Sequence, residues 1–301
     1  MPLFSISGGS LSPIKLFSLN REKDMQTITE KNLEVIFRLK FVCSEFQVGN
    51  FRLDTIGFDE EANSFTIIEY KKDQNFSIID QGFAYLSLML NHKSDFVLGY
   101  NEKIGSSSVK PAFDWSQSKI LFLSPSFTQY QVEAINFKDL PIELWEVHWY
   151  ANDTIHYERI KSKRTAMILN SISKTSKVIE KVGNEIRVFT EDAILNEVSK
   201  EVREAFIMIK NIVYQVNPDV DERVKKTMAC FYTDGKGLLW VKPTKKSITI
   251  WLRKGKYINR NGQVIPEGWG HLPELRLPAT EIDPVFTRKL IEQANNLQKT
   301  S

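Results

Sequence analysis

The chain has 301 residues, and its 40 Lys and Arg side chains against 37 Asp and Glu give a formal net charge of +3. A hydrophobic content of 42% with 26% charged residues excludes disordered and collagen-like proteins. No window approaches the roughly 18 consecutive apolar residues of a membrane helix, and the N-terminus lacks the pattern of a secretory signal. Two cysteines far apart and four histidines without ligand spacing argue against disulfides and a structural zinc site. We therefore expect a soluble, cytoplasmic protein with no membrane partner and, at about 100 to 200 residues per domain, with two domains.

The first domain is expected to span residues 1–160 and to alternate helices with strands. Turn residues at 59–64, between two apolar runs, predict a β-hairpin. In chain order we expect helix 27–41, strands 51–58 and 65–71, helix 80–91, strands 95–99 and 119–124, helix 127–137 and strand 142–150. This alternation predicts an α/β domain with a mixed sheet flanked by helices.

A Lys-, Ser- and Thr-rich passage, residues 161–188, is expected to be a linker. After it, apolar residues recur every three or four positions and predict a long helix. The elements expected here are helix 191–213, strands 228–232, 237–242 and 247–252, and helix 284–295. Residues 189–301 should therefore form a smaller α+β domain.

The charge is unevenly distributed along the chain. Residues 1–160 carry 15 basic and 21 acidic side chains, and residues 161–301 carry 25 and 16, so the net charges are −6 and +9. This asymmetry indicates that the second half meets either a polyanion or the first half. Eight cations stand together without an intervening acid: Lys236, Lys242, Lys245, Lys246, Arg253, Lys254, Lys256 and Arg260.

Aromatic residues are interleaved with these cations, at Trp240, Trp251 and Tyr257. Cations beside aromatic stacking platforms are typical of sequence-tolerant nucleic-acid binding. The alternation in residues 247–252 fits equally a half-buried strand whose aromatic side chains point into the core. Both interpretations stay open at this point.

A set of polar residues lies on the predicted hairpin and on the helix that follows it. Asp54 stands on its first strand, while Glu69 and Lys71, two apart at the end of the second, share a face. On the next helix, Gln81 and Tyr85 are four apart and share a face as well. Two carboxylates from adjacent strands can hold Mg²⁺, which binds oxygen ligands and uses one or two carboxylates. A lysine beside them can orient a water or stabilise charge on a phosphate, so the set suggests phosphodiester hydrolysis.

Together, Asp54, Glu69-x-Lys71 and Gln81-x-x-x-Tyr85 resemble the PD-(D/E)XK nuclease superfamily, most nearly its NucS-like and restriction-endonuclease-like members. The resemblance covers about residues 25–150 and implies a helix–hairpin–helix core around a mixed sheet. It further implies that Asp54 and Glu69 bind Mg²⁺ or Mn²⁺, that Lys71 assists the water, and that the helix pair flanks the site.

Three positions fit this resemblance less closely. Glu34 matches the first-helix glutamate of the family, and Arg52 a basic residue found near the first acid. The family's proline before that acid is absent, since Leu53 stands there. The acidic balance of this half is also unexpected for a domain that must hold DNA unaided.

The second half resembles a domain of unknown function that is often appended to such nuclease-like domains, some members of which carry a "predicted transport protein" label. The resulting expectation is a metal-dependent endonuclease acting on DNA, with RNA not excluded, whose basic domain assists binding. Two alternatives stay open. The protein could be a non-catalytic nucleic-acid binder on a nuclease fold, or an interaction protein whose basic half meets the acidic half or a second copy in a homodimer.

Overall fold

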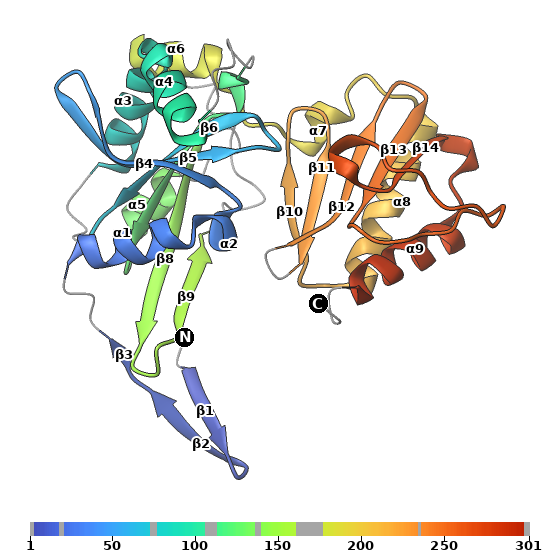
Figure 1. Cartoon of the computed structure of the whole chain (residues 1–301), viewed down its shortest axis with the longest axis horizontal. Helices are drawn as coiled ribbons and strands as arrows, with labels where there is room; N and C mark the ends of the chain where they lie inside the picture. Colours follow the sequence, from blue (N-terminus) through green and yellow to red (C-terminus); the bar gives the residue numbers. More distant parts are fainter. Residues whose placement is uncertain are drawn as a thin grey trace. The chain divides into compact units, whose positions relative to one another are not determined.

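The computed structural model describes residues 3–17, 21–72, 77–105, 113–135, 140–160, 177–233 and 236–297. The chain divides into two compact units, Met1–Val188 and Phe189–Ser301 (Figure 1). Within the described residues, no helix combines the length and the apolar character needed to cross a membrane.

The first unit contains a mixed seven-stranded sheet in the order β3-β8-β7-β6-β5-β4, with β9 added beside β8. The strands are β3 (Leu16–Phe17), β4 (Lys40–Val48), β5 (Phe51–Asp59), β6 (Ser64–Tyr70), β7 (Lys119–Ser124), β8 (Ile142–Tyr150) and β9 (Ile155–Arg159). Strands β6, β7 and β8 run parallel, while β4, β5 and β6 form an antiparallel meander. The predicted mixed sheet is therefore confirmed.

Helices cover both faces of this sheet. They are α1 (Glu22–Lys31), α2 (Leu33–Phe37), α3 (Ile78–Asn91), α4 (Lys93–Ile104), η1 (Trp115–Gln117), α5 (Gln129–Ala134) and α6 (Lys177–Glu185). Alternate residues of β7 belong to two cores: Phe122 packs with α3, α4 and α6, and Leu123 packs with α1 and α2. A strand buried on both sides is continuously apolar, which explains why β6 and β7 were recognisable in the sequence.

Several predicted elements differ from those observed. The expected helix 27–41 is two shorter helices, because the backbone leaves the helical conformation at Asn32 (φ −127°). The second helix ends where Arg38 turns left-handed (φ 57°), and β4 begins two residues later. Strand β4 was not predicted, since a bulge between Phe41 and Cys43 interrupts its alternation. The expected strand 95–99 is wrong, because these residues lie in helix α4. The short apolar run Phe96–Leu98 fits either structure, and Gly105 ends this helix in a left-handed conformation.

Residues 161–176 of the expected linker lie outside the described residues. The remainder contains α6, whose Val182 joins the core of the first unit together with Ile186. Lys93 Nζ bonds Glu185 Oε2 at 2.6 Å, which also fixes α6 to the start of α4. The C-terminal part of the expected linker is therefore a packed helix.

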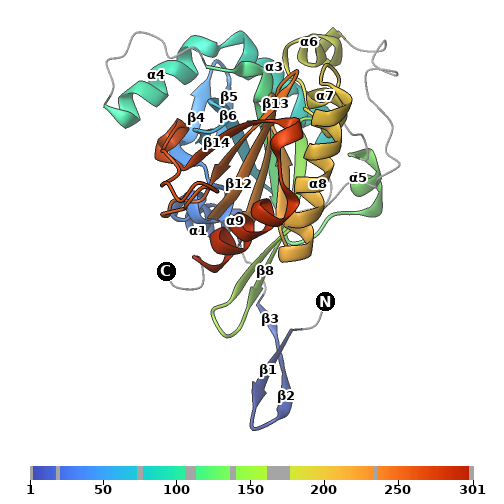
Figure 2. The ribbon, with the colours of Figure 1, turned by 90° about the vertical axis from the view of Figure 1, so that its right-hand side faces the viewer.

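The second unit contains one antiparallel five-stranded sheet in the order β10-β11-β12-β13-β14. Its elements are α7 (Glu191–Ile194), α8 (Lys200–Val216), β10 (Asp221–Val224), β11 (Ala229–Thr233), β12 (Lys236–Pro243), β13 (Ser247–Leu252), η4 (Trp269–His271), β14 (Glu274–Pro278), η5 (Ala279–Glu281) and α9 (Pro284–Asn296). Figure 2 shows α8 and α9 lying against this sheet. The expected helix 191–213 is interrupted because Ser199 caps a new helix, its Oγ accepting the N–H of Val202 at 3.4 Å.

Candidate active site

The antiparallel ladder between β5 and β6 ends at the pair Thr55–Ile68. One position further, the Asp54 carboxylate takes the place of a ladder carbonyl, and its Oδ2 accepts the N–H of Tyr70 at 3.0 Å. On the other side of β6, the N–H of Lys71 bonds to the carbonyl of Leu123 in β7 at 2.8 Å. The end of β6 is therefore fixed by both neighbouring strands, and Asp54 is one of the groups that fix it.

Glu69 and Lys71 meet at this end of β6, as their spacing predicted. Lys71 Nζ donates to Glu69 Oε1 at 2.8 Å, and Glu69 is only 3% exposed. On α3, Gln81 Nε2 donates to Tyr85 Oη at 3.0 Å, so the helix pair is joined as well. Burial raises the pKa of Tyr85, the charge of Glu69 acts in the same direction and that of Lys71 opposes it, as expected if α3 lies beside these two side chains.

Two buried oxygens in this region accept no hydrogen bond within the part of the chain that the structure describes. They are Glu69 Oε2 on β6 and Gln81 Oε1 on α3. Buried acceptors are nearly always satisfied, so such a pair calls for a cation or a hydrogen-bond donor beyond those that the described residues supply. Oxygen atoms are also the ligands that Mg²⁺ requires, and the donor set at this site therefore fits that ion.

Burial and like charge shift the titration of both acids. Burial and, to a lesser extent, the neighbouring charge of Asp54 raise the pKa of Glu69 to about 7, against the opposing effect of Lys71. Burial also raises the pKa of Asp54, although the N–H of Tyr70 opposes the shift. Two acids that are costly to ionise together are typical of functional sites that bind a cation.

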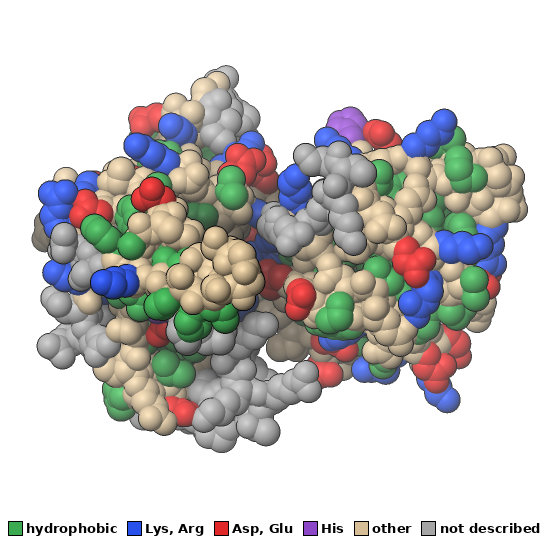
Figure 3. All heavy atoms as spheres, turned by 90° about the horizontal axis from the view of Figure 1, so that it is seen from below, with side chains coloured by type: hydrophobic (Ala, Val, Ile, Leu, Met, Phe, Trp, Pro, Cys, Tyr) green, Lys and Arg blue, Asp and Glu red, His purple; other side chains and the backbone are tan. Residues whose placement is uncertain are grey.

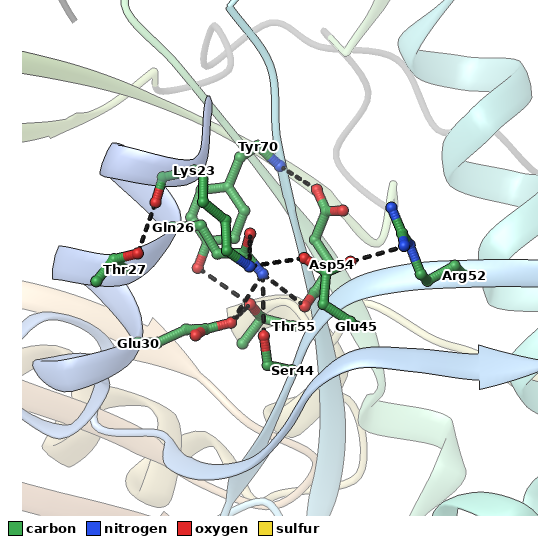
Figure 4. A network of polar contacts seen from close by, with 10 residues as sticks. All are labelled: Lys23, Gln26, Thr27, Glu30, Ser44, Glu45, Arg52, Asp54, Thr55 and Tyr70. Atoms are coloured by element: carbon green, nitrogen blue, oxygen red, sulfur yellow. Dashed lines mark hydrogen bonds and ion pairs between the residues drawn. The ribbon is translucent and has the colours of Figure 1, made fainter. Parts of the chain in front are cut away.

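A buried polar network supports Asp54 from the opposite face of the sheet (Figure 4). Gln26, only 4% exposed on α1, donates from Nε2 to the carbonyl of Asp54 at 3.0 Å and to Ser44 Oγ at 3.1 Å. The same nitrogen lies 2.9 Å from Glu30 Oε1, which also accepts from Thr55 Oγ1 at 2.6 Å. Sequence reasoning missed this network, because Gln26 and Asp54 are 28 positions apart and no local pattern links them.

Replacing Gln26 with leucine is expected to destabilise the protein by about 1 to 3 kcal/mol, because the Asp54 carbonyl and Glu30 would lose a donor in a buried position. Urea unfolding measures the change. Thr27→Ala is the matched control, since Thr27 is exposed and its Oγ1 donates to the carbonyl of Lys23 within α1. An effect of Gln26→Leu no larger than that of the control would show that the network does not hold Asp54.

The predicted residue Glu34 lies away from the centre of the site. Glu34 is exposed on α2, where its charge acts on Lys40, so it does not join the two acids. Glu22, in the first turn of α1, lies closer: its Oε1 accepts the N–H of Lys72 at 2.7 Å, and its charge raises the pKa of Asp54. The first helix begins at Glu22, five residues before the expected position 27, so Glu22 lies nearer to Asp54 than Glu34 does.

Arg52 lies at the edge of the site, in an ion-paired group. Its Nε is 2.9 Å from Glu45 Oε2, and Lys23 Nζ is 2.8 Å from Glu45 Oε1. Glu45 has φ 52° inside β4, a conformation that costs a non-glycine residue energy and is frequent at functional sites. The group keeps two largely exposed cations beside Asp54.

The described residues contain no group of three or more His, Cys, Asp or Glu side chains arranged to hold a metal ion. A cation here would therefore have Asp54 and Glu69 as its acidic ligands and would complete its shell with water or substrate oxygens. This pattern is common for Mg²⁺, which usually retains several waters.

In the second unit, the structure favours the core interpretation of the interleaved aromatic residues. Trp240 is 6% exposed, Trp251 7% and Tyr257 0%, so none of them can serve as a stacking platform. Trp240 and Trp251 belong to an apolar cluster on the sheet face opposite α8, while Tyr257 belongs to the core beneath the helices.

The cations of residues 236–260 divide into two groups. Arg253 is a structural clamp, which donates to the carbonyl of Gly237 at 2.7 Å and to Thr233 Oγ1 at 3.0 Å, and Arg260 pairs with Asp283. We therefore withdraw Arg253 from the predicted nucleic-acid-binding set. The side chain of Lys242 is half-buried; the exposed lysines are Lys236, Lys245, Lys246, Lys254 and Lys256.

No protein-family model matches the chain. A protein of Haemophilus influenzae, described as an uncharacterized protein, is 37% identical over 252 residues, which cover 84% of this chain and 83% of that protein. The chain belongs to the same family as this Haemophilus protein. Because the matched region covers most of both chains, the family extends over both compact units.

Two solved structures are similar to part of this chain. One is the crystal structure of a repair endonuclease from Pyrococcus abyssi, with 16% identity, 42% of this chain and 47% of that chain covered, and a TM-score of 0.25. The other is an EndoMS–dsDNA2 complex, with 19% identity, 44% and 47% covered, and a TM-score of 0.24. The chain spans less than half the length of either structure.

Proposed function

We propose that this protein is a metal-dependent nuclease that hydrolyses phosphodiester bonds in DNA. The observation that carries the proposal is the meeting of Glu69 and Lys71 beside Asp54, with one buried Glu69 oxygen lacking a partner among the described residues. The residue set and the order of its elements also fit the PD-(D/E)XK resemblance seen in the sequence.

In this proposal Asp54 and Glu69 hold one Mg²⁺ or Mn²⁺ ion. Such an ion supplies Lewis-acid polarisation of the scissile phosphate and a more acidic bound water. The Glu69 carboxylate has to be ionised to act as a ligand, so metal affinity should increase as the pH rises through about 7.

The remaining residues act on substrate and water. The Lys71 ammonium, held by Glu69, lies where it can stabilise negative charge that develops on the phosphate. Tyr85 and Gln81 form a hydrogen-bonded pair that can orient a water molecule. At the edge of the site, Lys23 and Arg52 supply cations for a neighbouring phosphate of the same strand.

A nicking assay on supercoiled and single-stranded DNA tests the function. The wild-type protein should cut only with Mg²⁺ or Mn²⁺ present, and Asp54→Asn should lower the rate by about 1000-fold or more, because the ion loses one of two acidic ligands. Glu102→Gln, a neutralised exposed acid on α4, is the control and should retain full activity.

Metal-dependent cutting that survives Asp54→Asn would reject this site. Salt-sensitive DNA binding without cleavage under either metal would instead identify a non-catalytic binder on the same fold.

A further inference from the structure

The sheet of the second unit has an outer face, turned away from α8 and α9, which carries cations in an arrangement that the sequence did not predict. Strand register places Lys242 of β12 opposite Thr249 of β13, and Thr249 opposite Arg276 of β14. Their sequence neighbours Val241 and Ile250 belong to the core beneath the helices. Because side chains alternate along a strand, the row of Lys242, Thr249 and Arg276 lies on the outer face.

Both cations of this row are free to meet a ligand. Lys242 is half-buried and Arg276 exposed, and neither side chain has a hydrogen bond or an ion pair within the part of the chain that the structure describes. Neighbouring strands lie about 4.8 Å apart, so the two side chains start about 10 Å from each other. The turn between β12 and β13 adds the exposed lysines Lys245 and Lys246 at the same end of the sheet.

An exposed tryptophan lies beside this row. The next row of the outer face holds Trp240 and Trp251, which are directly paired. Trp269 packs on both in T-shaped contacts, with ring centroids 6.3 and 5.7 Å away, and is itself 41% exposed. Glu274 accepts Trp251 Nε1 at 2.7 Å and the N–H of Trp269 at 3.4 Å, so the acid of this row helps to fix the tryptophan. Trp269 therefore offers the aromatic surface that the buried pair cannot provide.

The chemistry of this face fits a polyanion with unpaired bases. Residues 161–301 carry a net charge of +9. Lys and Arg side chains are interspersed with Asp and Glu over the face that Figure 3 shows, so net charge by itself does not locate a binding surface. The outer face joins cations to an aromatic ring in the adjacent row, about 7 Å along the strands. Single-stranded nucleic acid is bound in this way, with phosphates on cations and bases stacked on aromatic rings.

We propose that the outer face binds single-stranded nucleic acid, with Lys242 and Arg276 on its phosphates and Trp269 stacked on a base. This inference rests on the proposed function, since that function makes nucleic acid the substrate. It adds a surface on which the second unit would hold the substrate strand. A duplex, whose bases are already stacked on each other, would gain from the cations alone, so single strands should bind more tightly.

Two lysines of the same region lie away from this face and provide a matched control. Lys254 and Lys256 are exposed and follow β13 at the end of the strand opposite the turn. Gln293 of α9 donates from Nε2 to the carbonyl of Lys256 at 2.8 Å, so this segment lies beside the helices. Neutralising these two lysines removes as much charge as neutralising Lys242 and Arg276, but it leaves the outer row intact.

Fluorescence anisotropy of the full chain with a labelled single-stranded DNA oligonucleotide, without divalent metal, tests the proposal. Lys242→Gln combined with Arg276→Gln should reduce the slope of log K against log salt concentration by about 1.4, because two phosphate contacts are lost. Lys254→Gln with Lys256→Gln should leave the slope unchanged. Trp269→Leu should weaken binding by about 5- to 100-fold, and Trp269→Phe should restore most of it, because phenylalanine keeps a ring that can stack.

Circular dichroism should show that every variant is folded. A wild-type protein that does not bind the oligonucleotide, an outer-row variant with the wild-type slope, or an equal loss in the lysine control would each overturn the proposal. So would a Trp269→Leu protein that binds as tightly as the wild type, or poly-glutamate that binds as tightly as DNA, since the face would then fit an acidic protein.

Failure of the nuclease activity is distinguishable from failure of this inference. Binding that depends on the outer row, together with DNA left uncut under Mg²⁺ and Mn²⁺, would reject the nuclease site alone. Cutting of DNA by a protein whose binding is unaffected by the outer-row variants would reject the outer-face assignment alone.

Discussion

Replacing Glu69 with glutamine is expected to stabilise the metal-free protein by about 3 kcal/mol near pH 8 and by less than about 1 kcal/mol near pH 5. Burial raises the pKa of this carboxyl from 4.5 to about 7. Between these values the folded protein keeps a proton that the unfolded chain has released, so stability falls as the pH rises from about 4.5 to 7. Glutamine stays neutral and avoids this loss, and Lys71, partly exposed, can turn toward solvent.

Near pH 8, divalent metal should make the wild type more stable than the Glu69→Gln variant. At about a thousand times the dissociation constant, a bound ion stabilises the wild type by about 4.1 kcal/mol, and the variant without its carboxylate should gain little. Thermal unfolding with and without Mg²⁺ measures both effects. Glu158→Gln, an exposed acid of β9, is the control and should follow the wild type at every pH. A Glu69→Gln protein that is less stable than the wild type near pH 8 without metal would show that the native carboxylate is not strained.

Replacing Lys71 with methionine is expected to lower the cleavage rate by about 100- to 1000-fold while metal binding is retained. The ammonium is held against Glu69 and would contribute to the reaction by acting on the phosphate rather than by holding the ion. Its removal also raises the pKa of Glu69, because the Lys71 ammonium lowers that pKa, so both measurements belong well above neutral pH.

The readout that separates these roles is the metal-induced shift of the thermal midpoint, which should persist in Lys71→Met and vanish in Glu69→Gln. Lys72→Met is the matched control, since Lys72 is adjacent in sequence and exposed. If Lys71→Met kept more than about a tenth of the wild-type rate, or if it lost the metal-induced shift, the lysine would not have the assigned role.

The parts of the fold that were predictable have local patterns. The hairpin of β5 and β6, the helix α3 and the buried strand β7 follow from turn residues and hydrophobic periodicity within short windows. Strand β4 and helix α4 could not be predicted in this way. A bulge interrupts the alternation of β4, and the short apolar run in α4 fits a strand as well as a helix. The N-terminal hairpin of β1 (Leu3–Ser7) and β2 (Ser10–Ile14) lacks the β-branched residues that favour strands, apart from two isoleucines.

The candidate site was predictable to the same extent. Glu69 and Lys71 share a face because strands alternate, and Gln81 and Tyr85 share one because helices repeat, so spacing alone was sufficient. Gln26 reaches Asp54 through the packing of α1 on the sheet. The two residues are 28 positions apart, so no local sequence pattern predicts this contact. The burial of Trp240 and Trp251 was equally hidden, because alternation shows that a strand has two faces but not what covers the second.

The central claim is that one divalent ion binds between the carboxylates of Asp54 and Glu69. Anomalous diffraction from crystals grown with Mn²⁺ above neutral pH tests it most directly. The account predicts one strong anomalous peak in contact with both carboxylates and close to Glu69 Oε2, which accepts no hydrogen bond within the described residues. No peak there, or a peak elsewhere while these two acids stay bonded only to protein groups, would contradict it.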